Sequence, residues 1–192
     1  MQNLFELSLE EKEGWLRNLA DLMGVWEDWR LLATHGERLL PLASQVAHAI
    51  QERLKTNPHT QDTDPVERAL EAIAQVYFNE PTLDAAYLER RAQAGRAYLQ
   101  AGLGPAQLLA GIYGLWVDEW SKAFTQLFPD PGLQARFNRA LALVSLFNAA
   151  VVLTQYAYEA AQAQRLREEE FLRAVGISRE LYQQMAKAAG KA

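Results

Sequence analysis

Apolar residues recur at three- and four-residue steps along most of the chain, and this spacing places them on one face of a helix. The alternating apolar and polar runs that indicate β-strands are nearly absent. Ser8 and Glu11 have the spacing of a capping box, in which each side chain accepts a hydrogen bond from the other residue's backbone N–H. They predict a helix that ends near Met23, before Gly24. The pattern as a whole predicts an all-α protein.

Cap residues, prolines and glycines divide the rest of the chain into further helices. Asp64-Pro65 and Asp130-Pro131 each place an N-cap acid before a proline that suits the first helical position. The predicted helices cover residues 25–33, 41–56, 65–78, 82–102, 105–127 and 131–175, and a short tail helix runs from Ser178 to about Lys187. The helix that starts at residue 131 would hold roughly 40 residues and extend roughly 60 Å.

The segment between residues 33 and 41 interrupts this series. Thr34 and Glu37 have the spacing of a second capping box. Pro41 lacks a backbone N–H, and its ring clashes with the preceding helical turn. We therefore expect a break between Gly36 and Pro41.

The number of helices and the short connections between them predict a helix bundle or a globin-like fold. The sequence holds no internal repeat and no low-complexity linker. We expect one domain over residues 1–175 and a short C-terminal helical tail over residues 176–192. The end of the last long helix is charged, with a thin apolar line of Leu166, Leu172 and Val175. Such a helix often pairs with a partner helix.

Composition and charge argue against several classes of function. A net charge of -5 without a clustered basic face argues against a nucleic-acid partner. The absence of cysteine excludes disulfides, thiol catalysis and zinc–thiolate sites. Residues 1–13 lack the pattern of a signal peptide, and the apolar run over residues 140–154 is too short to span a membrane. We expect a soluble cytoplasmic protein that does not interact with membranes. No nucleophile–base set, phosphate loop or metal-ligand spacing predicts an enzyme.

One face of the predicted helix over residues 82–102 is the first candidate for a binding site. It carries Leu83, Tyr87, Ala94, Tyr98 and Ala101. This face should point into the core or into a pocket. Gly95 lies beside it and costs about 1 kcal/mol of helix propensity relative to alanine, which favours the close approach of another helix. Arg90, Arg91 and Arg96 flank the face and either frame an anionic group or face solvent.

Residues 84–114 resemble the motif of globin-coupled sensors and protoglobins. The matching residues are Tyr87 and Arg91 of a Tyr-x-x-x-Arg segment, then Gly95, and then Gly102 and Leu103 of a Gly-Leu turn. Tyr98 stands where the family has its haem-ligating histidine, and Ala94 stands in place of an isoleucine. The resemblance covers about residues 10–165. It implies a globin-like fold with an extra N-terminal helix and a long C-terminal helix.

The same resemblance implies a haem-type pocket. Its cofactor-binding candidates are Tyr98, Tyr87, Ala94 and Gly95. Globin haem iron is held by a neutral imidazole, which Tyr98 cannot supply. The distal tyrosine of oxygen-binding members falls near Ala49 and Ile50, where this chain has no tyrosine. The chain is therefore similar to the non-haem globin domains of stressosome regulators. The residues do not identify a cofactor, and haem is implied by the resemblance alone.

Histidines and aromatic residues are the other candidates for contacts with a ligand. His35 at a helix start, His48 off the apolar stripe and His59 in a polar loop are read as surface residues. The aromatic residues near the expected pocket are Tyr77, Phe78, Tyr87, Tyr98, Tyr113, Trp116, Trp120, Phe124 and Phe147. They form either a packed core or an apolar cavity for a small molecule or fatty acid. Tyr98 itself is a core residue, a contact for a different ligand, or a tyrosinate ligand of haem.

Three functions follow from these observations. The first is a stand-alone sensor-globin domain in signalling, without the usual haem ligation, which forms a homodimer and acts on a downstream partner protein. The resemblance implies a four-helix dimer interface made by Leu108, Ile112, Leu115, Leu141, Val144, Asn148 and Val151. The second is a haem-binding oxygen or redox sensor with Tyr98 as ligand. The third is a helical adaptor without a ligand.

Overall fold

The computed structural model describes residues 7–58, 60, 62–176, 178, 180–182, 184 and 187. All regular structure in these residues is helical, which confirms the all-α prediction. The chain forms two compact units, residues 1–155 and residues 156–192, and the long last helix passes from one into the other.

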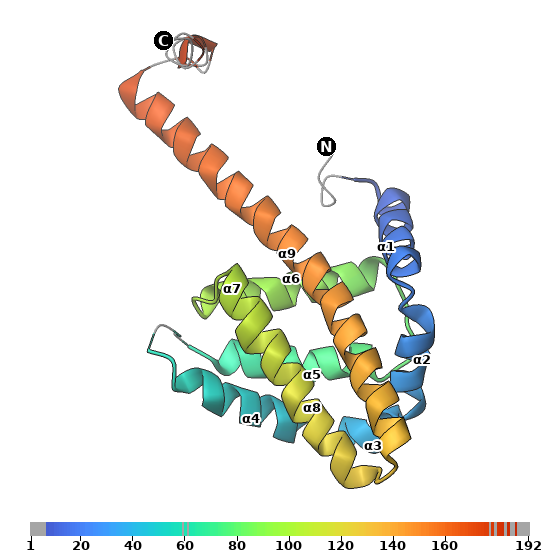
Figure 1. The fold of residues 1–192 in the computed structure, drawn as a ribbon. Coiled ribbons are helices and arrows are strands. Elements are labelled where there is room, and N and C mark those ends of the chain that lie inside the picture. Colours follow the sequence, from blue (N-terminus) through green and yellow to red (C-terminus); the bar gives the residue numbers. More distant parts are fainter. Residues whose placement is uncertain are drawn as a thin grey trace. The chain divides into compact units, whose positions relative to one another are not determined.

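The first unit contains most of the helices (Figure 1). They are α1 (Leu9–Met23), α2 (Trp26–Thr34), α3 (Gly36–Leu39), the 3-10 turn η2 (Leu40–Leu42), α4 (Ala43–Lys55), α5 (Asp64–Tyr77), α6 (Ala85–Gln100), α7 (Pro105–Gln107), the π-helical segment η3 (Leu108–Tyr113), α8 (Gly114–Leu127) and the first part of α9 (Pro131–Val175). Helix α5 packs against both α4 and α6, and α8 packs against α4.

Three of the predicted helix ends are confirmed. Ser8 Oγ accepts from the Glu11 backbone N–H, and Glu11 Oε2 accepts from the Ser8 N–H, so the capping box is confirmed. Gly24 ends α1 with a φ of 65°, in the left-handed region that favours glycine. Asp130 Oδ1 accepts from the Gly132 N–H and caps α9 as predicted.

The second predicted capping box is wrong. The Thr34 hydroxyl donates to the carbonyl of Arg30 inside α2, and His35 separates α2 from α3. The chain does not break here but continues as α3 and η2. Gly36 allows this path, because a Cβ at this position would lie 1.9 Å from the carbonyl oxygen of Phe78. Nothing in the local pattern around Gly36 indicates this contact.

Two other predicted helix starts shift by one or two residues. Asp84, rather than Thr82, is the N-cap of α6, and its Oδ1 accepts from the Tyr87 N–H. Asp64 is the first residue of α5 rather than its N-cap, and its Oδ1 accepts from Gln51 Nε2 on α4. A long-range partner has therefore replaced the local capping bond at Asp64.

The core of the first unit is rich in aromatic rings. Phe78 lies 4.4 Å from Trp120, and Phe137 of α9 lies 3.7 Å from Phe124 of α8, as measured between ring centroids. Tyr77 contacts Trp116 at 5.1 Å. Each such pair contributes about 0.5–1.5 kcal/mol beyond the burial of its surface. These rings join α5, α8 and the first part of α9.

The faces predicted for dimerisation belong to this core. Leu108, Ile112, Leu141, Val144, Asn148 and Val151 are all buried within the chain, and Leu115 is half-buried. The prediction that these residues form a surface interface is therefore wrong. Among the outward-facing residues are Leu109 of η3 and Leu146 of α9, which are 42% and 56% exposed.

Helix α9 is long and apolar enough to cross a membrane, although the sequence count had placed its apolar run below that length. Of its most apolar 18-residue segment, 61% is buried inside the protein. Ser145 and Asn148 on this helix make hydrogen bonds to other helices. Burial and polar contacts of this kind are typical of the central helix of a globular domain.

The second unit begins at Tyr156 and holds the C-terminal part of α9. Most of its described side chains are exposed, among them Leu166, Phe171 and Val175. Gly176 ends α9 with a φ of 68°. Ser178 Oγ accepts from the Leu181 N–H, as expected for the cap of the predicted tail helix. Much of that predicted helix lies outside the described residues.

Candidate functional site

Helix α6 carries the four predicted site residues and buries all of them. Tyr87 and Tyr98 have no exposed surface, Ala94 is 3% exposed, and Gly95 is buried as well. The prediction that this face of the helix points inward is confirmed by their burial. Of the four residues, Ala94 also borders a surface groove between α5 and α6.

Tyr87 is packed among rings. Its centroid lies 6.1 Å from that of Trp29 on α2 and 6.2 Å from that of Phe147 on α9, and the last two rings are 5.6 Å apart. Trp29 Nε1 donates to the carbonyl oxygen of Val76. The three rings therefore fill the core beside this part of α6.

A polar network lies within the same core. Asn148 Oδ1 accepts hydrogen bonds from the Tyr87 hydroxyl at 3.1 Å and from Arg91 Nη1 at 3.3 Å. The Asn148 amide donates to the carbonyl of Val144 one turn earlier. Tyr77 donates to Ser145 Oγ at 3.3 Å. The partners of Ser145 and Asn148, on α5 and α6, could not be read from the sequence.

Arg91 is the unusual member of this network because its charge is not balanced. Its side chain is 1% exposed, it forms no ion pair with any described residue, and its Nε has no hydrogen-bond partner there. A guanidinium cannot shed its charge in a protein, so burial does not neutralise it. The guanidinium carbon lies 5.8 Å from the centroid of the Tyr87 ring, which is a cation–π contact. No carboxylate pairs with it among the described residues, and a buried charge without an ion-pair partner is costly.

Three buried tyrosines surround the Arg91 charge. Burial raises the pKa of Tyr77, Tyr87 and Tyr113, and the positive charge of Arg91 opposes this rise in all three. The Tyr113 hydroxyl has no hydrogen-bond partner among the described residues. Tyr113 ends the π-helical segment η3, a type of segment that often occurs at functional sites.

The groove between α5 and α6 reaches Arg91 from the surface. We call it the α5–α6 groove, and its volume is about 230 Å³. It is lined by Pro65, Arg68, Ala69, Ala72, Arg90, Arg91, Gln93, Ala94 and Ala97. Four of these residues are alanines, whose short side chains leave space between the two packed helices. The lining has three arginines and no acidic residue.

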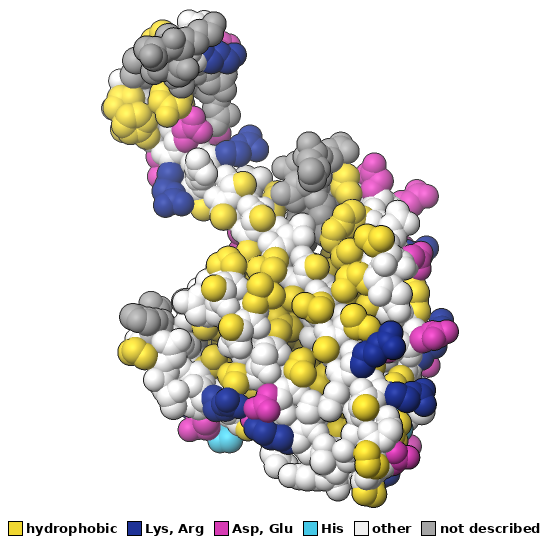
Figure 2. Space-filling view, in the orientation of Figure 1, with side chains coloured by type: hydrophobic (Ala, Val, Ile, Leu, Met, Phe, Trp, Pro, Cys, Tyr) yellow, Lys and Arg dark blue, Asp and Glu magenta, His cyan; other side chains and the backbone are white. Residues whose placement is uncertain are grey.

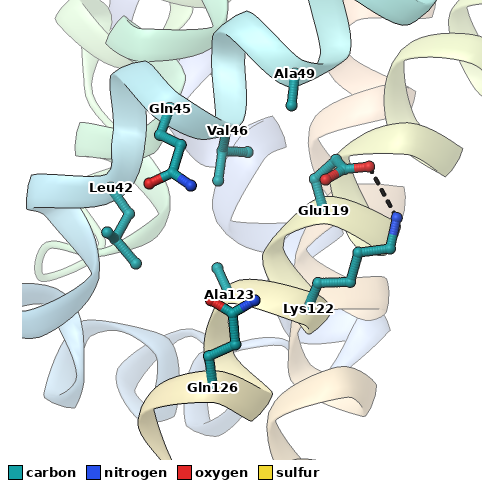
Figure 3. Close-up of a pocket in the computed structure, with 8 residues that line it drawn as sticks. All are labelled: Leu42, Gln45, Val46, Ala49, Glu119, Lys122, Ala123 and Gln126. Atoms are coloured by element: carbon teal, nitrogen blue, oxygen red, sulfur yellow. Dashed lines mark hydrogen bonds and ion pairs between the residues drawn. The ribbon is translucent and has the colours of Figure 1, made fainter.

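A second groove lies between α4 and α8 and has a volume of about 140 Å³ (Figure 3). Ala49, near the place where the family's distal tyrosine was expected, lines this groove, whereas Ile50 is fully buried. Lys122 Nζ at the rim is paired with Glu119 and with Asp118. The charges at this groove are therefore already balanced within the protein.

The described histidines lie elsewhere. His35 is partly buried against Phe124 and Phe128, at 5.3 and 4.8 Å between ring centroids, so the prediction of a surface position is wrong. Burial lowers its pKa, and the charge of Arg38 lowers it further. His48 Nδ1 lies 3.2 Å from Glu67 Oε1 at the surface. His59 lies outside the described residues.

The described part of the chain holds no group of three or more His, Asp or Glu side chains that could bind a metal ion. No protein-family model matches the chain, and no curated protein sequence matches it.

Proposed function

We propose that this chain is a stand-alone sensor domain of the globin-coupled-sensor type that acts in signalling without the usual haem ligation. The observation that carries the proposal is Tyr98, which is fully buried on α6 at the position where the family's motif has histidine. The motif residues Tyr87 and Arg91 are also buried, as expected for residues that support a central site.

The core around Tyr87 and the placement of the described histidines argue against haem. Haem needs a flat apolar space and an axial ligand, usually an imidazole. Trp29, Tyr87 and Phe147 contact one another and fill the core beside this helix. The two described histidines are engaged with Phe124 and Phe128 and with Glu67. We therefore derive no function through iron, oxygen or redox chemistry, and we propose no enzymatic reaction.

A homodimer is part of the proposal. Because most of the interface residues expected from the sequence are buried, we place the interface on residues that face outward. Leu143, Leu146, Ala150 and Leu153 recur on α9 at alternating steps of three and four, which is the spacing of a helix–helix seam. Leu146 is exposed and the other three are half-buried. Figure 2 shows hydrophobic side chains gathered on this face of the molecule. A second copy of the chain that contributes the same stripe would bury the stripes of both copies. A change at this interface would then be passed to a downstream partner protein.

An absorption spectrum tests the proposal against its main alternative, a haem sensor with Tyr98 as the iron ligand. Protein produced with excess haem should be colourless and should show no Soret band after purification. A stoichiometric Soret band that disappears in Tyr98→Phe would overturn the proposal in favour of tyrosinate ligation. A Soret band that persists in Tyr98→Phe would also overturn it and would point to another iron ligand.

The third function, a helical adaptor without a ligand, differs from the first in its response to small molecules. The unbalanced charge of Arg91 in a groove favours a ligand-responsive domain over an adaptor.

A further inference from the structure

Arg91 combines three properties that a purely structural arginine rarely has together. It is buried, its one hydrogen bond to a described residue goes to a neutral amide oxygen, and it lines a groove that opens to the surface. Buried arginines are normally paired with a carboxylate or phosphate, because their charge persists at any pH that a protein tolerates. The protein itself supplies no such group among its described residues.

We propose that the α5–α6 groove binds a small organic acid, whose carboxylate pairs with the Arg91 guanidinium. A carboxylate offers two acceptor oxygens that match the planar fork of guanidinium N–H donors. The Arg91 Nε has no hydrogen-bond partner among the described residues and is itself buried, so the carboxylate must enter the space between α5 and α6 to reach it. Binding would replace an unbalanced buried charge by a hydrogen-bonded ion pair.

The rim of the groove adds attraction for anions. Arg68 of α5 and Arg90 of α6 line it, are exposed, and form no ion pair with a described residue. By contrast, Arg96 on the same helix is paired with Glu89 at 3.0 Å. Positive groups that surround a concave site raise the local concentration of anions.

The size of the groove limits the ligand to a small molecule. A volume of about 230 Å³ corresponds to roughly seven or eight water molecules at about 30 Å³ each. A free acid of a few carbon atoms fits this space. The alanine walls, Ala69 and Ala72 on α5 and Ala94 and Ala97 on α6, would contact its carbon chain.

Nuclear magnetic resonance of the Arg91 Nε–H group tests the proposal directly. The ¹⁵N-labelled protein is titrated with sodium acetate and sodium succinate at constant ionic strength, with sodium chloride and sodium phosphate as comparisons. We expect the Arg91 Nε–H resonance, assigned through Arg91→Lys, to shift in a saturable manner with the carboxylates. The proposal is overturned if no carboxylate produces a saturable shift in the millimolar range, or if chloride or phosphate shifts the resonance as strongly as the carboxylates do.

Matched variants locate the binding. Ala72→Leu adds bulk to the groove from an exposed position on α5, whereas Ala86→Leu adds the same bulk at an exposed position on α6 outside the groove lining. We expect Ala72→Leu to weaken carboxylate binding by about tenfold or more and Ala86→Leu to leave it unchanged. Equal affinity in Ala72→Leu and in the unmodified protein would place the acid elsewhere and overturn the assignment to this groove.

A second pair of variants tests the rim charge without touching the core. Arg90→Gln removes a positive charge from the lining, and Arg96→Gln removes one from the same helix outside it. We expect about a threefold loss of affinity for Arg90→Gln and no change for Arg96→Gln. Equal losses in both variants would indicate a general effect of net charge and not a site.

This inference goes beyond the proposed function and does not depend on it. A haem absorption spectrum would overturn the proposal of a sensor domain without haem. The carboxylate site would still be tested by the titration. Failure of the titration would leave the spectral test of the proposed function unaffected.

Discussion

Arg91 on α6 donates a hydrogen bond of 3.3 Å to Asn148 Oδ1 on α9, and both side chains are buried. This amide oxygen is the one hydrogen-bond acceptor that the described residues give the Arg91 side chain. Replacing Asn148 with leucine should therefore leave a buried guanidinium without an acceptor. We expect Asn148→Leu to lower the free energy of unfolding by about 3 kcal/mol in urea titrations.

The double variant Arg91→Met with Asn148→Leu is the control for this prediction. Replacing both partners by apolar groups of similar length avoids the stranded charge, so it should recover a large part of the loss. If the double variant loses the sum of the two single losses, the two side chains are not coupled and the interpretation of the network is wrong.

Alanine substitutions at two glycines should change the stability of the protein in opposite directions. A Cβ at Gly36 would lie 1.9 Å from the backbone oxygen of Phe78, whereas a Cβ at Gly14 in α1 meets nothing within 4 Å. We expect Gly36→Ala to destabilise the protein by about 3 kcal/mol through overpacking. Gly14→Ala should stabilise it by about 0.5–1 kcal/mol through helix propensity. Thermal unfolding monitored by circular dichroism measures both changes, and a neutral Gly36→Ala would contradict the close packing of α3 on the end of α5.

Two buried tyrosines should also differ. The Tyr113 hydroxyl has no hydrogen-bond partner among the described residues, whereas the Tyr77 hydroxyl donates to Ser145. Tyr113→Phe removes an unsatisfied polar group and should raise the free energy of unfolding by up to about 1 kcal/mol. Tyr77→Phe should lower it by about 1 kcal/mol. Urea titrations at neutral pH measure both, and a marked loss of stability in Tyr113→Phe would reveal a partner for its hydroxyl.

The same tyrosines make stability sensitive to alkaline pH. Burial raises the pKa of Tyr77 and of Tyr113 in the folded protein, so each stays protonated while its unfolded counterpart ionises at about pH 10. Their contribution to stability is therefore complete below about pH 10 and is lost as the pH rises above it. We expect Tyr113→Phe to lose less stability than the unmodified protein when urea titrations are repeated at increasing alkaline pH. An identical pH dependence in both proteins would contradict this assignment.

The exposed leucines of α1 and α9 distinguish an interface from ordinary surface. Leu146 is 56% exposed on the apolar stripe of α9, and Leu22 is 84% exposed on α1. If α9 forms the dimer interface, Leu146→Glu should convert a dimer into a monomer in analytical ultracentrifugation, because it buries two carboxylates without partners. Leu22→Glu should leave the protein a dimer. A monomeric unmodified protein, or a dimer that survives Leu146→Glu, would contradict this interface.

Features that depend on residues close together in the chain could be predicted from the sequence. The capping box of Ser8 and Glu11, the left-handed Gly24 and the cap at Asp130 each involve contacts within five residues, so the local pattern was sufficient. The periodicity of the segment around Tyr87 and Tyr98 likewise identified the buried face of α6, because helix geometry alone fixes which residues share a face.

Which partner each helix face meets depends on the packing of the helices. Six of the seven residues of η3, α8 and α9 expected at a dimer surface are buried in the core, since an apolar stripe looks the same whether it meets its own chain or a second copy. Asn148 finds its partners 57 and 61 residues away, and Gly36 meets Phe78 at the end of α5. The α5–α6 groove exists because alanines on two helices happen to face each other around Arg91. Long-range contacts of this kind depend on how the helices pack together, and a one-dimensional pattern does not contain that information.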